Sequence, residues 1–184
     1  MVVRAATVVP YAEAHDEEGD MGAHMDDSDA KGIGAGGPVG PLVEGEGIRV
    51  VRPGSEDSET PQGLLGVGAV SRETVGAGGI FMARHRVPPG AHSDLHSHAN
   101  CERAVYVLRG RGYAYGGEDM GEYVEAGPGD FVYIPANLAH VVGCPAGGEA
   151  LEYVVARDAP GEVVVTLRAA EDLPIGPGGR MRDA

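Results

Sequence analysis

Short segments rich in β-branched and aromatic residues recur between residues 47 and 168, and a few turn residues separate each from the next. Valine, isoleucine and tyrosine favour strands, whereas the intervening glycine, proline and asparagine favour turns. No window of this region combines a sustained 3.6-residue apolar period with helix caps. The expected strands are IRVVRPG, GIFMARHRVPPG, RAVYVLRGRGYAYGG, EYVEAGPGD, FVYIPANLAHVVG, ALEYVVARD and GEVVVTLR. Because the connections are too short for parallel crossovers, the pattern predicts an all-β sandwich, jelly roll or barrel of antiparallel strands.

Length and charge narrow the class of protein further. A chain of 184 residues suits one domain with a single core. Its formal net charge of −14 repels phosphate groups, so we expect a small-molecule substrate as partner, and neither nucleic acid nor a membrane. No segment approaches the ~20 apolar residues of a membrane span, and the N-terminus lacks a basic region followed by an apolar one. These features predict a soluble cytoplasmic protein.

Residues 1–46 differ from the rest of the chain. The acidic run HDEEGDMGAHMDDSDAKG is followed by GIGAGGPVGP, which is rich in glycine and proline. Such a composition predicts a flexible arm, in which His15 and His24 are solvated. The β-barrel would then occupy residues 47–168, and residues 169–184 would form an irregular C-terminal tail.

His96 and His98 are the first candidates for chemistry. They are separated by one residue, and on a strand their imidazoles would point to the same face because side chains alternate with a period of two. If His140 and Glu102 reach the same cavity, the set supplies three neutral imidazoles and one carboxylate. A six-coordinate metal ion held in this way keeps open positions for water, substrate or dioxygen.

Two segments carry a resemblance to a known family. GAHSDLHSHANCERAVYVLRG, residues 90–110, resembles the first sequence motif of the cupin superfamily, and GDFVYIPANLAH, residues 129–140, resembles the second. The resemblance covers roughly residues 49–168 and is strongest to small single-domain cupins. It implies a double-stranded β-helix in which both motifs line one cavity that holds one divalent transition metal. The ligands that it implies are His96, His98, Glu102 and His140.

The sequence departs from the cupin pattern at the glutamate. Glu102 has the expected spacing from the histidines, but counting back from Gly110 places Arg103 in the register of the ligand. A regular strand would therefore turn Glu102 away from the cavity. Either a β-bulge restores the orientation of Glu102, or Arg103 faces inward and the site has three histidines only. We expect the bulge, because an inward guanidinium beside a dication is electrostatically costly. Asn137 replaces a common glycine, a mild change because asparagine tolerates the left-handed conformation.

Other polar residues near the motifs are weaker candidates. Strand tyrosines usually serve in packing, and arginine can bind a substrate carboxylate through two hydrogen bonds. The candidates for catalysis or substrate contact are Tyr106, Tyr113, Tyr133, Arg84, Arg86 and Arg103. His85 and His92 precede the first motif, and we expect them in the core or on the surface rather than as ligands.

Three classes of function remain open. Cupins include dioxygenases, decarboxylases, isomerases, lyases and hydrolases, so the resemblance implies a metal site more than a reaction. The leading hypothesis is a metal-dependent dioxygenase-type oxidoreductase acting on a small organic substrate, with Fe(II) favoured over Mn, Ni or Zn. The alternatives are an isomerase or lyase on the same metal and a non-catalytic module that binds or senses a metal or small molecule. A structural scaffold would form a homodimer by strand exchange near residues 49–53.

Overall fold

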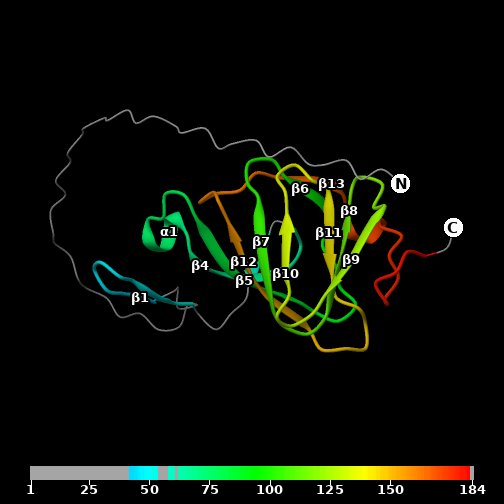
Figure 1. The fold of residues 1–184 in the computed structure, drawn as a ribbon, viewed down its shortest axis with the longest axis horizontal. Coiled ribbons are helices and arrows are strands. Elements are labelled where there is room, and N and C mark those ends of the chain that lie inside the picture. The colour runs from blue at the N-terminus through cyan, green and yellow to red at the C-terminus, as the bar shows by residue number, and fades with distance from the viewer. Residues whose placement is uncertain (1–41, 54–57, 61, 183–184) are drawn as a thin grey trace, which may run out of the picture. The chain divides into compact units, whose positions relative to one another are not determined.

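A computed structural model of the chain describes residues 42–53, 58–60 and 62–182 (Figure 1). Most of the expected arm, residues 1–41, lies outside these residues. In the described part, the helical elements are the short helix α1 (Arg72–Val75) and the 3-10 turn η1 (Ala170–Asp172), and no helix is long and apolar enough to cross a membrane. The strands are β1 (Leu42–Glu44), β2 (Val50–Arg52), β3 (Ser58–Glu59), β4 (Leu65–Val70), β5 (Phe81–Val87), β6 (Leu95–His98), β7 (Arg103–Arg109), β8 (Gly112–Gly116), β9 (Glu122–Ala126), β10 (Phe131–Ile134), β11 (His140–Gly143), β12 (Leu151–Arg157) and β13 (Val164–Arg168).

Two antiparallel sheets form the body of the fold. One has the strand order β10-β7-β12-β5-β4-β3, and the other has the order β13-β6-β11-β8-β9. From β5 to β13 the chain passes from one sheet to the other at nearly every connection, as the ribbon shows (Figure 1). This alternation is the double-stranded β-helix of a jelly-roll barrel. The predicted all-β fold class is therefore confirmed.

The main core fills the space between the two sheets. On β12, alternate side chains are buried, as expected for a strand with one face toward a core. Fully burying a valine or leucine side chain contributes about 1.5–3 kcal/mol, so this layer dominates the stability of the barrel. Its buried members are Leu64, Ala83, Val87, Val107, Cys144, Leu151, Tyr153 and Val155.

A second apolar layer lies on the outer face of the five-stranded sheet. Tyr115 on β8 and Val141 on β11 pack there against Leu173 and Ile175 from the C-terminal residues. The Tyr115 hydroxyl donates a hydrogen bond of 3.2 Å to the carbonyl of Gly179. The segment after β13, although mostly irregular, is therefore part of the folded structure.

Strand β4 has no counterpart among the expected strands. Its sequence LGVGAV contains two glycines, which weaken a strand signal. Gly66 packs against the ring of His85 on the neighbouring β5, where an added Cβ would come within 2.9 Å of His85 Cδ2. The glycine is explained by a close contact in the folded sheet, which sequence periodicity does not reveal.

Candidate metal centre

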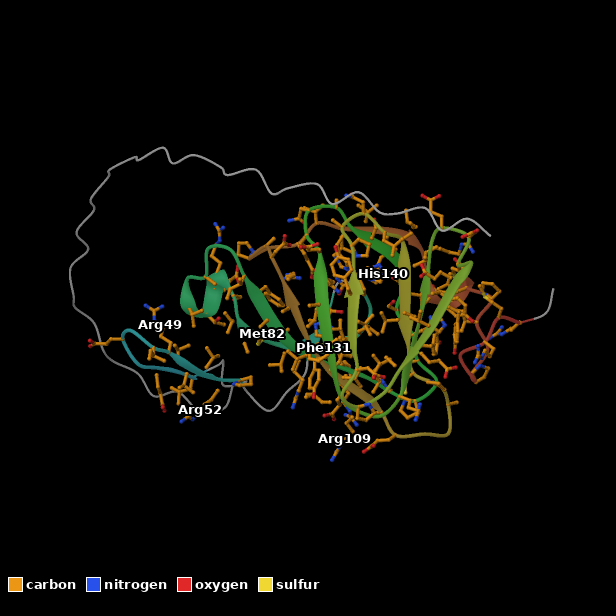
Figure 2. All side chains as sticks on the ribbon, in the orientation of Figure 1. Arg49, Arg52, Met82, Arg109, Phe131 and His140 are labelled. Atoms are coloured by element: carbon orange, nitrogen blue, oxygen red, sulfur yellow. The ribbon has the colours of Figure 1, made fainter. Side chains whose placement is uncertain are left out.

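Strands β6 and β11 bring three histidines together inside the barrel. His96 and His98 lie two residues apart on β6, and both side chains are buried. His140 begins β11 and pairs directly with His96 across the sheet. The ligand nitrogens of the three residues all lie within 4.8 Å of one another. His96 and His98 thus meet His140, which lies 42 residues beyond His98 in the chain, on adjacent strands of one sheet. His140 is labelled in Figure 2.

The turn before β11 fixes the position of His140. Asn137 adopts a φ of 64°, the left-handed conformation that asparagine tolerates. Its backbone N–H donates a hydrogen bond of 2.8 Å to the carbonyl of His98. The loop that delivers His140 is therefore tied to the strand that carries the other two histidines.

Hydrogen bonds define which ring nitrogen is free in His96 and His140. Nδ1 of His96 lies 2.8 Å from the carbonyl of Asp94, and Nδ1 of His140 lies 2.9 Å from the carbonyl of Leu138. A carbonyl oxygen only accepts, so these Nδ1 atoms carry the protons and the Nε2 atoms keep their lone pairs. In the described residues, Nε2 of His96, His98 and His140 is buried without a hydrogen-bond partner. Three buried ring nitrogens that lack hydrogen-bond partners and lie close together fit a divalent metal ion.

The environment keeps the triad in its metal-binding protonation state. Burial, reinforced by the neighbouring histidines and Arg103, lowers the pKa of His140 to about 3. Burial also lowers the pKa of His96 to about 4, and it lowers the pKa of His98. Because neutral imidazole is the form that binds metals, all three rings are available as ligands near neutral pH.

The structure does not bring Glu102 to the triad. Glu102 is exposed, and its carboxylate accepts a 2.5 Å hydrogen bond from the Tyr133 hydroxyl. Arg103 faces the interior and is 6% exposed. The register between β7 and β10 is regular from Arg103 to Tyr106, and the irregularity against β12 falls at Leu108. The prediction of a β-bulge at Glu102 is therefore wrong. The structure has the alternative arrangement, in which Arg103 faces inward and the site consists of three histidines.

The charge of the inward Arg103 is balanced by Glu162, a residue outside both sequence motifs. Glu162 precedes β13, and one of its oxygens contacts Nη2 of Arg103 and, at 2.5 Å, Nη1 of Arg157. The same oxygen lies 3.3 Å from Nδ1 of His98. Burial alone would raise the pKa of Glu162, but His98 and the two guanidinium groups hold that pKa far below its usual range. A charged carboxylate therefore lies behind the triad. It offsets the electrostatic cost of placing the Arg103 guanidinium near a divalent metal.

The three candidate tyrosines lie on different parts of the barrel. Tyr106 is on the outer face of β7, where its ring packs on Phe131 with 4.7 Å between centroids. Tyr113 is buried in the outer apolar layer, and burial raises its pKa well above the usual range. Tyr133 is mostly exposed but borders a pocket of about 470 Å³ that also contains His140. Of the tyrosines proposed for substrate contact, Tyr133 has the clearest access to this pocket.

The remaining candidates are not part of the centre. Arg86 is exposed and lies 4.0 Å from Glu152, and Arg84 is exposed on the same strand. His85 is buried, with Nδ1 3.2 Å from the Tyr153 hydroxyl. His92 contacts the backbone of Ser93 outside the triad. His85 therefore lies in the core, and among the described residues the group of three histidines includes neither His85 nor His92.

The pocket connects the surface with His140, one of the three histidines. It lies where the edge strand β10 faces β8 and β9, between two strand edges that do not pair with each other. Ile134 and Leu138 give it apolar walls, while Glu122 and Tyr133 add polar groups. Its volume of about 470 Å³ suits a small organic molecule.

A double-stranded β-helix with three inward histidines on adjacent strands defines the cupin class of fold and site. The sequence agrees, since residues 83–156 match the cupin domain family, and the chain therefore carries a cupin domain. No curated protein sequence matches the chain.

Similar solved structures are known. They include oxalate decarboxylase from Bacillus subtilis (22% identity, TM-score 0.52, 61% of this chain and 30% of that one) and from Lactobacillus farciminis (18%, 0.52, 61% and 33%). Another is the polyketide cyclase RemF from Streptomyces resistomycificus (21%, 0.51, 63% and 78%). This chain thus spans about a third of the length of the decarboxylases. At such identities the likeness shows a shared fold and does not assign a reaction.

Proposed function

We propose that the chain is a metal-dependent enzyme that holds one divalent transition metal on His96, His98 and His140 and acts on a small organic substrate. The observation that carries this proposal is the set of three buried Nε2 atoms, none with a hydrogen-bond partner among the described residues, in a group of histidines whose ligand nitrogens lie within 4.8 Å of one another. Burying an unsatisfied polar atom costs roughly 1–3 kcal/mol, and a shared metal removes that cost from all three rings at once.

The donor set supports a transition metal, and we favour Fe(II) over Mn, Ni or Zn. Imidazole nitrogen suits iron, nickel and zinc, whereas magnesium and calcium prefer oxygen ligands. Bacillus subtilis oxalate decarboxylase is described as having Mn(II) centres, which supports a divalent metal here as well. When bound, such a metal would supply Lewis acidity and open positions for substrate and dioxygen, as a dioxygenase-type reaction requires.

The charges around the site favour a substrate with an anionic group. The three imidazoles are neutral, so they leave the charge of a divalent metal uncompensated. Behind them, Arg103 and Arg157 share the single carboxylate of Glu162. The pocket that reaches His140 would admit the substrate, with Ile134 and Leu138 in contact with its apolar part. Small carboxylates, diketones and thiols, which can ionise and chelate a metal, fit these conditions.

Dioxygen consumption by the iron-loaded protein tests the proposal. The protein is loaded with Fe(II) without oxygen and then mixed with oxygen and each substrate class, and the His96→Ala variant serves as control. Substrate-dependent uptake that the control lacks supports a dioxygenase. Turnover without oxygen uptake would favour an isomerase or lyase, and tight binding without turnover would favour a sensing module.

The outer face of the six-stranded sheet supports a homodimer. Met82 and Phe131, both labelled in Figure 2, are exposed on β5 and β10, and Leu108 is exposed on β7 between them. Apolar side chains gathered on one sheet face are typical of interfaces between subunits. Light scattering coupled to gel filtration measures the mass, and Phe131→Glu should convert a dimer to monomers.

A further inference from the structure

In each of the three histidines, Nδ1 faces an oxygen atom, but the source of that oxygen differs in His98. In His96 and His140, Nδ1 is hydrogen-bonded to the backbone carbonyl two residues earlier in the chain. In His98, Nδ1 instead lies 3.3 Å from a side-chain oxygen of Glu162, at an orientation short of hydrogen-bond geometry. All three rings turn Nδ1 toward an oxygen and leave Nε2 without a partner.

We propose that Glu162 is the positioning residue of His98, and that its carboxylate accepts the Nδ1 proton and aims Nε2 at the metal. The inference rests on the metal site of the proposed function. A histidine ligand is usually held by such an outer oxygen, which fixes the tautomer and makes the ring a better donor. Backbone carbonyls perform this task for two rings, and Glu162 performs it for the third.

Glu162 is itself held firmly in place. Its oxygen that faces His98 also contacts the guanidinium groups of Arg103 and Arg157. These two arginines are direct neighbours in the register of β7 and β12, and both are buried. Arg157 is fixed further by the ring of Phe81, whose centroid lies 3.5 Å from the guanidinium carbon. Two buried cations side by side require a shared anion, so Glu162 has little freedom to leave.

This arrangement accounts for the departure from the cupin motif. Glu102 points outward to Tyr133, and the inward position is taken by Arg103. Arg103 then helps to hold a carboxylate from a distant part of the sequence behind His98. The carboxylate near the site therefore belongs to Glu162, which contacts the outer nitrogen of His98, and not to Glu102 as a ligand. A metal here would be bound by three neutral rings.

Zinc affinity tests the inference with a readout other than activity. Competition with a chromogenic chelator gives the dissociation constant for the wild type and for Glu162→Gln, which keeps the shape but removes the charge. We expect roughly 10–100-fold weaker zinc binding in the variant, as for other losses of an outer-shell partner. Nitrogen-15 NMR of histidine in the zinc-loaded wild type should show three protected Nδ1–H groups, and the His98 signal should exchange rapidly in the variant.

Matched variants separate positioning from stability. Glu162→Gln leaves two buried guanidinium groups without a carboxylate partner. The double variant Glu162→Gln/Arg157→Gln restores the original net charge of the cluster. It should therefore fold even if the single variant does not. It should show the same loss of affinity, whereas Arg157→Gln alone should show a smaller one. Val87→Ala, in the main core, should lower the melting temperature without changing zinc affinity.

Two results would overturn the inference. One is wild-type zinc affinity in both variants that lack Glu162. The other is a wild-type spectrum without a protected Nδ1–H on His98, which would indicate that Glu162 is a direct ligand or has no part in the site. If the wild type itself does not bind zinc, the proposed metal site fails instead, and the two failures are thus distinguishable.

Discussion

Glu102 immediately precedes β7 and Arg103 is its first residue, and their side chains point in opposite directions. The carboxylate of Glu102 accepts a hydrogen bond from Tyr133 on the surface, while the guanidinium of Arg103 is buried beside Glu162. Alternation along a regular strand permits only one of them to face the triad. The identity of the inward residue decides whether a metal here has a carboxylate ligand.

Replacement of these two neighbours should therefore have unequal effects. Glu102→Gln removes an exposed carboxylate and should leave both metal affinity and stability as in the wild type. Arg103→Gln breaks a buried charged contact and should lower the free energy of unfolding by about 1.5–3 kcal/mol. Chemical denaturation and chelator competition measure the two quantities. Weaker metal binding in Glu102→Gln than in Arg103→Gln would restore Glu102 as a ligand and contradict the orientation described above.

Loss of any histidine of the triad should abolish metal binding. His96→Ala and His140→Ala each remove one of three Nε2 donors, and two imidazoles do not hold a transition metal tightly. Elemental analysis of purified protein should find about one equivalent of metal in the wild type and almost none in the variants. His92→Ala is the matched control, because His92 lies outside the triad and its Nδ1 is 3.0 Å from the Ser93 carbonyl. Full metal content in both triad variants would rule out this site.

The sequence predicts the histidines of this site better than it predicts their surroundings. The fold class follows from alternating strands and turns, and the strand positions of His96 and His98 follow from their spacing. The left-handed turn at Asn137 is compatible with the sequence, because asparagine is one of the few residue types that tolerate that conformation. These features depend on local sequence and on two spaced motifs.

Glu162 and the orientation of Glu102 depend on contacts between distant segments. The contacts of Glu162 with Arg103 and His98 join residues that are far apart in the chain, and a single glutamate before a strand carries no signal of such a role. The register of β7 is set by its pairing with β10 and β12, which places the irregularity at Leu108. The position of a β-bulge cannot be read from one strand alone.

Removal of the metal should lower the stability of the barrel. A ligand that binds only the folded state stabilises it by about 2.7 kcal/mol when its free concentration is 100 times its dissociation constant. The melting temperature, followed by calorimetry, should therefore fall when a chelator strips the protein, and it should recover when metal returns. His140→Ala should melt at the same temperature with and without chelator. A chelator effect of equal size in this variant would show that the metal acts elsewhere on the protein.

The C-terminal residues should contribute to stability without affecting the metal. Ile175 is 2% exposed and packs with Leu173 against Val141 on the outer face of the five-stranded sheet. Ile175→Ala should leave a cavity there and lower the free energy of unfolding by about 2–4 kcal/mol. Metal affinity should stay unchanged, because Val141 and His140 are adjacent on β11 and face opposite sides of the sheet. Urea denaturation gives the first quantity and chelator competition the second. A large loss of metal affinity would mean that the outer layer sets the position of His140.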